Sequence, residues 1–254
     1  MKEALELLND LKFLGIKNSI EYRISEAIES NLSHQDFITL LLEDEQLYRK
    51  NRRCETLKKR AKFRDKAYLE NFELTSKRGI NKSMIQDFKS LRFIESHQHL
   101  IFLGGTGAGK SFLAQGVGHA ACAVGVEVFF ISLNRLFKEL EMADRQGTYL
   151  SYMKRLRERV KLLIIDDMGL RSYSHREATI LYEILEERYQ KGSIIVTSQV
   201  SPLGWKSLFE DPVIAEAICD RLTACAHMVE IKGDSFRSRH KVGGQEGKIS
   251  CKKQ

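Results

Sequence analysis

A glycine-rich run at residues 104–111 carries the residue types that bind a triphosphate. Its residues are Gly104, Gly105, Thr106, Gly107, Ala108, Gly109, Lys110 and Ser111, which have the spacing of a phosphate-binding loop. Glycine lets the backbone curl with its N–H groups pointing at phosphate oxygens, where a β-carbon would block the approach. Lys110 is predicted to bind the β- and γ-phosphates of ATP, and the Ser111 hydroxyl is predicted to ligate Mg²⁺. A simple glycine-rich turn is the alternative, but the flanking apolar strand and helix favour a nucleotide site.

Two acids, Asp166 and Asp167, end the apolar run that starts at Leu162. Carboxylates at the end of such a run lie at the carboxyl edge of a parallel sheet, where open α/β sheets bind ligands. Asp166 is predicted to hold Mg²⁺ through water, and Asp167 to orient or polarise the attacking water. The alternative is that both acids begin a solvated turn before Gly169. Many ATPases of this kind carry glutamate at the second position, so the shorter Asp167 is expected to lower the rate or to need a longer water bridge.

Three further polar positions are weaker candidates for catalysis. Gln199 follows Thr197 and Ser198 at the end of another apolar run, where it could reach the γ-phosphate, although capping of the strand end is an equal alternative. Arg221 lies on a predicted helix and could act across a subunit boundary as an arginine finger. Arg237 follows the last apolar run and could approach the nucleotide. Surface arginines more often form ion pairs or remain solvated.

The elements that must position these side chains follow from alternating apolar runs after His99. Short runs at 100–103, 126–131, 162–165, 194–197 and 228–231 are separated by longer helical stretches. Such continuous β-branched runs indicate strands that are buried on both faces. The pattern therefore predicts an α/β domain with a five-stranded parallel sheet between layers of helices.

A helical module is predicted before that sheet. Apolar residues at helical spacing indicate two short helices parted near Gly15, and Ser33 with Asp36 resembles a capping box that starts a longer helix. We expect four parts: a helical N-terminal domain at 1–66 that binds DNA or a partner, a connector at 67–97, the ATPase domain at 98–238, and a disordered basic tail at 239–254.

The long N-terminal helix is predicted to become strongly basic in its second half. Ten cations fall within eighteen residues, against only two acids, Glu55 and Asp65; they are Arg49, Lys50, Arg52, Arg53, Lys58, Lys59, Arg60, Lys62, Arg64 and Lys66. The whole chain has a formal net charge of +7 and a pI near 9.1. This run, above all Arg49 to Arg64, is predicted to bind duplex DNA without strong sequence preference. A solvated helix face is the alternative.

Composition favours a cytoplasmic protein. The five cysteines are scattered, without Cys-x-x-Cys pairs or histidines at ligand spacing, so a zinc site is not indicated. No apolar run approaches the length of a membrane span, and the first thirty residues carry acids. We therefore expect a soluble protein without a membrane partner.

Several short motifs between about Leu5 and Arg239 match one protein family. They are Phe37, 40–45, Arg52, Arg53, 59–63, 69–72, the phosphate loop, 166–169, Arg188, Tyr189, Thr197, Ser198, Trp205, 220–222, Gly233 and 235–237. In these residues the chain resembles the IstB-like transposition helper ATPases, relatives of the DnaC-type helicase loaders in the AAA+ superfamily. The resemblance implies an AAA+ αβα core that follows a small all-helical N-terminal domain. The core is expected to lack the helical lid of many AAA+ proteins, because the chain ends soon after the fifth strand.

The same resemblance implies roles for particular residues and partners. It implies ATP and Mg²⁺ as cofactors, ATP-driven assembly of a homo-oligomer on DNA with the ATP site at the subunit interface, and delivery or stimulation of a cognate transposase. Arg221 becomes the expected finger and Arg237 the expected second sensor, while Gln199 stands where the family usually has asparagine. Two functions stay open: a DNA-stimulated ATPase that assists a transposase in DNA recombination, and a loader of a replicative helicase. A small-molecule kinase is disfavoured by the paired acids at 166 and 167.

Overall fold

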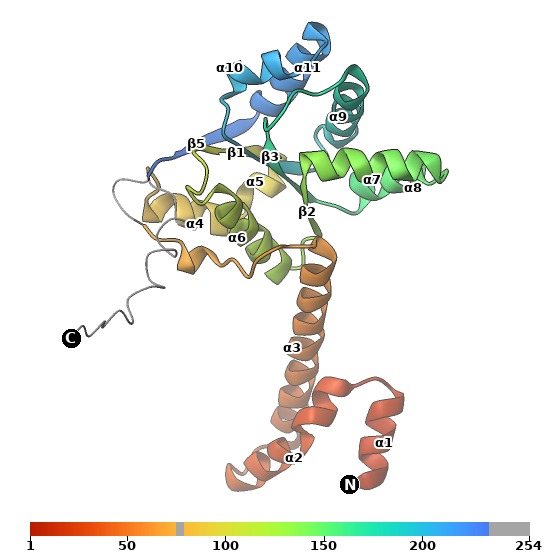
Figure 1. Ribbon diagram of the computed structural model, residues 1–254. Coiled ribbons are helices and arrows are strands. Elements are labelled where there is room, and N and C mark those ends of the chain that lie inside the picture. The colour runs from red at the N-terminus through yellow and green to blue at the C-terminus, as the bar shows by residue number, and fades with distance from the viewer. Residues whose placement is uncertain (75–78, 234–254) are drawn as a thin grey trace, which may run out of the picture.

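The computed structural model describes residues 1–74 and 79–233 and has a parallel five-stranded sheet at its centre (Figure 1). The strands are β1 (His99–Gly104), β2 (Val128–Ser132), β3 (Leu162–Met168), β4 (Ser193–Ser198) and β5 (Ala226–Ile231). Their order across the sheet is β2-β3-β4-β1-β5, and every pairing is parallel. The predicted α/β class and strand number are therefore confirmed.

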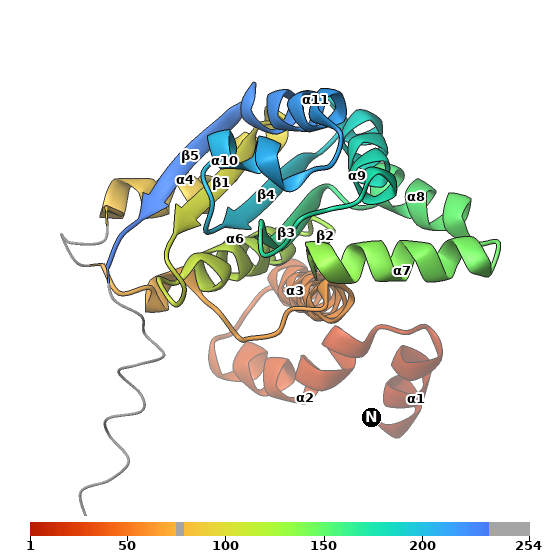
Figure 2. The ribbon, with the colours of Figure 1, turned by 45° about the horizontal axis from the view of Figure 1, so that its top comes forward.

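Helices cover both faces of the sheet (Figure 2). One buried cluster joins the sheet to α4 (Lys82–Ser90), α5 (Arg92–Glu95), α6 (Lys110–Ala123) and the end of α3 (His34–Ala61). The other joins it to α7 (Leu133–Arg145), α8 (Tyr149–Glu158), α9 (His175–Arg188), α10 (Pro202–Trp205) and α11 (Pro212–Thr223). The central strands have unbroken apolar sequences because both of their faces are buried.

The carboxyl ends of β1, β3 and β4 meet at one edge of the sheet. Since β4 lies between β1 and β3, the loop after β1 and the acids that end β3 lie on either side of the last residues of β4. The pairing of β3 with β4 is regular up to Ile165 and irregular from there to Met168. This irregularity falls on the two acids that the sequence predicts to act on ATP.

The N-terminal helices form an arm that extends from the α/β body (Figure 1). Helices α1 (Lys2–Asp10) and α2 (Leu14–Glu29) lie at the far end of α3, which has 28 residues. The break between α1 and α2 lies at residues 11–13, before the predicted position at Gly15, and Gly15 is the second residue of α2. Ser33 caps α3 by accepting the N–H of Asp36 at 3.1 Å, so the predicted N-terminus of this helix is confirmed.

Gly15 is needed for contact between α2 and α3. The buried carboxylate of Glu45 accepts the N–H groups of Gly15 (2.6 Å) and Ile16 (3.2 Å), and Arg49 donates to its other oxygen at 2.7 Å. A β-carbon on residue 15 would lie 2.6 Å from the Cα of Glu45. Burial raises the pKa of Glu45, but these donors outweigh it and hold the pKa below its ordinary value. The charged Glu45 therefore anchors α2 on α3.

The second half of α3 packs on the α/β body. Leu57 and Ala61 are buried in the cluster that contains α6, and Arg53 donates to the carbonyl of Gly125 at 3.3 Å. The helix ends at Ala61, and the φ of +60° at its C-cap Lys62 turns the chain towards α6. α3 therefore contacts α2 at one end and the α/β body at the other.

A buried arginine fixes the opposite edge of the sheet. Arg188 at the end of α9 is 1% exposed and donates to the carbonyls of Val160, Lys161 and Ser193, which flank the starts of β3 and β4. Burial lowers its pKa to about 10, so the side chain stays charged at neutral pH. This residue is structural and lies away from the predicted nucleotide site.

None of the helices within residues 1–74 and 79–233 combines the length and apolar character needed to cross a membrane.

Candidate functional site

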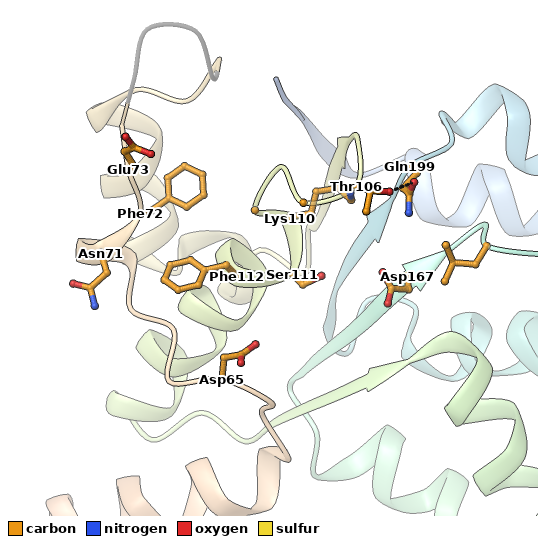
Figure 3. Close-up of a pocket in the computed structure, with 13 residues that line it drawn as sticks. Asp65, Asn71, Phe72, Glu73, Thr106, Lys110, Ser111, Phe112, Asp167 and Gln199 are labelled. Carbon is orange, nitrogen blue, oxygen red and sulfur yellow. Dashed lines mark hydrogen bonds between the residues drawn. The ribbon is translucent and has the colours of Figure 1, made fainter. Parts of the chain in front are cut away.

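A cavity of about 580 Å³ opens at the carboxyl edge of the sheet (Figure 3). It is lined by Asp65, Asn71, Phe72, Glu73, Thr106, Gly107, Gly109, Lys110, Ser111, Phe112, Asp167, Leu170 and Gln199. In the view of Figure 3, Lys110 and Ser111 lie between two aromatic rings on one side and Asp167 and Gln199 on the other. The volume is in the range of cavities that enclose a ligand of nucleotide size.

The phosphate loop wraps the start of α6 as the sequence predicts. Gly104 has φ +150°, and a β-carbon there would lie 2.2 Å from the carbonyl oxygen of Ile231 on the neighbouring strand β5. Gly109 has φ +102° and directly precedes α6, so the N-terminal N–H groups of that helix face the loop. The ammonium of Lys110 donates to the carbonyls of Gly104 and Gly105 at 2.8 Å each. The loop therefore holds its cation at the place where phosphates would be bound.

Asp166 joins the phosphate loop to β4. Its Oδ1 accepts the hydroxyls of Ser111 and Thr197, each at 2.7 Å, and its side chain is 1% exposed. Its Oδ2 is buried without a hydrogen-bond partner within the described part of the chain. A serine hydroxyl beside a buried carboxylate with one unsatisfied oxygen is a fitting donor set for Mg²⁺, which takes one or two carboxylates and keeps several waters. Ser111 and Asp166 would hold that ion.

Asp167 has an unusual backbone conformation at the irregular end of β3. Its φ is +59°, in the left-handed region, where aspartate and asparagine are tolerated better than most residues. Its N–H donates to Thr197 Oγ1 at 3.0 Å, and its side chain is 34% exposed and lines the cavity. The backbone thus directs the Asp166 carboxylate inward to Ser111 and Thr197 and presents the Asp167 carboxylate to the cavity.

Gln199 connects the end of β4 to the phosphate loop. Its Oε1 accepts the hydroxyl of Thr106 at 2.7 Å, and both side chains line the cavity (Figure 3). The side chain is therefore placed to respond to what the phosphate loop binds.

Arg64, which the sequence predicts to contact DNA, lies beside the two acids. Its Nη1 is 3.6 Å from Asp166 Oδ2 and 4.0 Å from Asp167 Oδ2, and its guanidinium covers the ring of Phe130 at 5.5 Å. The last turn of α3 and the segment that follows it therefore bring one cation of the basic run to the two acids that end β3.

Gln115 and His119 hold that segment on α6. The buried Gln115 accepts the N–H groups of Arg64 (2.8 Å) and Asp65 (3.0 Å), and its own amide donates to the Ser111 carbonyl at 3.2 Å. His119, one turn later, contacts the carbonyl of Asp65 at 3.1 Å, and burial lowers its pKa. Neither role was predicted from the sequence. Buried polar residues on an otherwise apolar helix were the available signal.

The side of the cavity opposite Asp167 is aromatic. Phe72 and Phe112 have ring centroids 6.4 Å apart, and Asn71 and Glu73 line the wall beside them. Three of these residues belong to the predicted connector, to which the sequence analysis assigned no chemistry. Rings with adjacent amide and carboxylate groups can stack on a nucleobase and bond to its edge.

Arg221 does not line the cavity of its own chain. Its Nε donates to Glu186 at 2.6 Å, and its guanidinium lies 4.5 Å from the centroid of the Tyr189 ring. These partners hold it on the surface of α9 and α11. Arg237 lies outside the described residues, as do the closing residues predicted to be disordered.

Acids already neutralise part of the basic run on α3. Arg49 pairs with Glu45, Lys58 with Glu55, and Lys62 with Glu139 of α7. The remaining cations on the exposed side of this helix are Lys50, Arg52, Arg53, Lys59 and Arg60.

Comparison with known proteins gives consistent results. The family described as "IstB-like ATP binding protein" matches residues 6–244. An insertion sequence ATP-binding protein of Sinorhizobium fredii, y4pL, is 34% identical over 234 residues, which are 92% of this chain and 95% of the relative.

Two solved structures share the fold. AMPPCP-bound DnaA from Aquifex aeolicus has a TM-score of 0.57 at 22% identity and covers 71% of this chain and 54% of its own. The DnaC helicase loader has a TM-score of 0.55 at 19% identity and covers 65% of this chain and 97% of its own. The predicted AAA+ fold is confirmed by these likenesses.

Proposed function

Because the chain belongs to the family of IstB-like ATP-binding proteins, we propose that it is an ATPase that assembles on duplex DNA and assists or recruits a cognate transposase. One observation carries this proposal: the segment that follows the basic helix α3 lines the same cavity as the phosphate loop. Nucleotide and DNA would then act on one continuous stretch of chain. The printed name of the relative, an insertion sequence ATP-binding protein, supports the link to transposition.

The cavity residues take the roles that their positions allow. Lys110 exchanges its two carbonyl partners for the β- and γ-phosphates of ATP. Ser111 and Asp166 hold Mg²⁺, which supplies positive charge at the phosphate oxygens. Asp167 accepts a hydrogen bond from the attacking water and polarises it. Gln199 changes its contact with Thr106 when the γ-phosphate departs, and so reports hydrolysis.

The site is completed by a second copy of the chain. Arg221 lies at the surface, where it would exchange Glu186 for the γ-phosphate bound to a neighbouring subunit and stabilise it. Arg237 acts as the second sensor in the same nucleotide site. ATP thereby bridges two subunits and builds a homo-oligomer, which hydrolysis loosens.

The oligomer binds DNA through the cations of α3. Lysine and arginine contacts to phosphates release counterions, so the affinity falls steeply with salt and depends little on sequence. DNA holds neighbouring subunits together and so stimulates hydrolysis. Such an ATPase is expected in the cytoplasm, where ATP and DNA meet.

A loader of a replicative helicase is the second candidate. Helices α1 and α2 and the turn between them expose several large apolar side chains: Leu7, Leu11, Tyr22 and Ile28 are 61–76% exposed. An exposed apolar surface at the end of an arm favours a protein partner there. A transposase that binds α1 and α2 supports the first function, and a hexameric helicase that binds them supports the second.

Sedimentation with duplex DNA tests the proposal. The wild-type chain should sediment with DNA in ATP and Mg²⁺, and less in ADP, whereas Lys110→Ala should fail to bind ATP or to assemble. Arg145→Ala, which removes a cation that is paired with Glu141 at the surface, serves as the matched control. Sedimentation of Lys110→Ala that equals wild type would overturn the ATP-dependent assembly.

A further inference from the structure

A second group of cations faces the basic run of α3 across strand β2. Two hollows of about 400 and 390 Å³ lie side by side there and share Arg60 and Glu127. The first is lined by Arg49, Arg52, Arg53, Thr56, Leu57, Arg60 and Glu127, and the second by Lys59, Arg60, Lys62, Glu127, Arg155 and Arg159. Arg155 and Arg159 come from α8 and its C-terminal cap, so the ATPase body contributes to this surface.

The geometry makes this surface a groove along the edge of the sheet. β2 is an edge strand, and α3 contacts it. The ring of Phe129 on β2 is close to cations of both walls, with Lys62 at 5.4 Å and Arg155 at 4.7 Å from its centroid. Arg155 and Arg159 are four residues apart, so they lie on one face of α8. We call the two hollows together the basic groove.

The charges in the basic groove are largely uncompensated. Glu127 is the one acid among the residues that line it. Within the described ranges, no carboxylate lies within 4.0 Å of a cation of Arg52, Arg60, Arg155 or Arg159. Like charges held together at a surface repel each other, and an anion that enters between them relieves this repulsion.

The size and composition of the groove fit a nucleic-acid backbone better than an acidic protein. Arg49 and Arg60 are eleven residues apart, which is about 16 Å along a helix and matches roughly five phosphates of one DNA strand. Leu57 is the only large apolar side chain among the lining residues, whereas the centres of protein interfaces are apolar and aromatic. Arginine forks bind phosphate oxygens in pairs.

We propose that α3 and α8 together bind one stretch of DNA backbone in the basic groove, with Arg155 and Arg159 as phosphate contacts supplied by the ATPase body. This inference rests on the proposed DNA binding and extends it to a second element. DNA then contacts the body of each subunit as well as its arm. The path of the DNA is consequently set by how ATP arranges the bodies in the oligomer.

Salt titration of DNA affinity tests the groove directly. The full chain is mixed with a mixed-sequence duplex and a non-hydrolysable ATP analogue, and the logarithm of the binding constant is followed against the logarithm of the salt concentration. The α8 variant is Arg155→Gln with Arg159→Gln, and the α3 variant is Arg52→Gln with Arg60→Gln. The control is Arg145→Gln with Arg157→Gln, which removes the same charge from cations paired with acids elsewhere.

Each groove variant should lower the salt slope by about 2 and weaken binding at 0.1 M salt by tenfold or more, because about 0.9 counterions are released per phosphate contact. The control should keep the wild-type slope. Arg155→Lys with Arg159→Lys, which keeps both charges, should also keep most of it. ATP-dependent assembly without DNA should be unchanged in all of these variants.

The outcomes separate the inference from the proposed function. If the α8 variant matches the control while the α3 variant loses slope, the groove is wrong and DNA binding by α3 stands. If both groove variants match the control, or the wild-type chain shows no salt-dependent binding, the proposed DNA binding itself is wrong. If Arg155→Lys with Arg159→Lys reduced the salt dependence of binding as much as Arg155→Gln with Arg159→Gln, the two arginines would not act as phosphate contacts.

Discussion

Arg64 Nη1 lies 3.6 Å from Oδ2 of Asp166, the buried oxygen that accepts no hydrogen bond from the described residues. The other oxygen of this carboxylate accepts two hydroxyls. A cation delivered by the segment after α3 therefore faces the position that suits Mg²⁺. Arg64 and a bound Mg²⁺ would attract the same oxygen, so the presence of one would weaken the binding of the other.

Replacing Arg64 tests this relationship. Arg64→Gln leaves a buried carboxylate without its cation and should lower the free energy of unfolding by about 1–3 kcal/mol when no nucleotide is added. The rise in melting temperature on adding ATP and Mg²⁺ should exceed that of wild type, because the ion no longer competes with the guanidinium. Thermal unfolding with and without ATP and Mg²⁺ measures both effects, and Arg64→Lys should fall between. An equal loss of stability under the two conditions would show that Arg64 serves packing alone.

Asp167→Asn should separate assembly from hydrolysis. Asparagine also tolerates a φ of +59° and can occupy the same space, but it cannot polarise water. ATP turnover should fall at least about a hundredfold while ATP binding persists, and complexes with DNA should outlast those of wild type. Turnover assays and sedimentation measure this, with Asp167→Ala as a variant that adds about 1 kcal/mol of backbone strain. If Asp167→Asn loses assembly as Lys110→Ala should, this assignment fails.

Mixing experiments test whether Arg221 acts on a neighbouring subunit. Arg221→Ala should bind ATP normally but hydrolyse it at least about a thousandfold more slowly, the size of effect seen when an arginine finger is absent. Mixed with Lys110→Ala, it should regain part of the activity, because some interfaces then combine an intact phosphate loop with an intact Arg221. Arg176→Ala, from another surface ion pair, is the control. Mixtures that stay as inactive as the separate variants would place Arg221 outside the site.

The stability of the ATPase body should fall as the pH drops from 6.5 to 4. Burial lowers the pKa of His99 from 6.5 to about 4, and its Nδ1 accepts the N–H of Ile194 at 3.2 Å. The unfolded chain therefore takes up the proton first, so stability is complete above pH 6.5 and decreases below it, by about 3 kcal/mol at pH 4.

His99→Asn should remove most of that pH dependence, because it keeps an acceptor for Ile194 but does not titrate. Urea unfolding at pH 7 and pH 5 measures the difference between the two proteins. An unchanged dependence in the variant would assign the acid sensitivity to other groups.

Residues in short motifs could be predicted from the sequence, since local spacing largely determines their chemistry. The phosphate loop and Asp166 are examples: a strand, a tight turn and a helix place Lys110 and Ser111 without help from distant segments. The five strands were recognisable because strands buried on both faces have continuous apolar runs.

Residues that reach the site from elsewhere could not be predicted in this way. Gln115 accepts the N–H of Arg64, about fifty positions away in the sequence. Arg155 and Arg60 line the same hollow only because α3 packs beside β2. Such contacts depend on tertiary packing, which no local pattern records. Charge alone could not show which cations of the basic run are available to DNA, since Arg64 lies beside Asp166 and Lys62 pairs with Glu139 of α7.

Helix α3 gives the chain a mechanical property. Its 28 residues contain no glycine or proline, the usual causes of a kink, so it can transmit a rotation over about 42 Å. The part of α3 before Arg53, where the helix first contacts the α/β body, is about 28 Å long. A tilt of about 10° there would move the far end of the helix by roughly 5 Å. The helix would then behave as a lever arm that turns an ångström-scale adjustment around the nucleotide into a displacement large enough for a bound protein to follow.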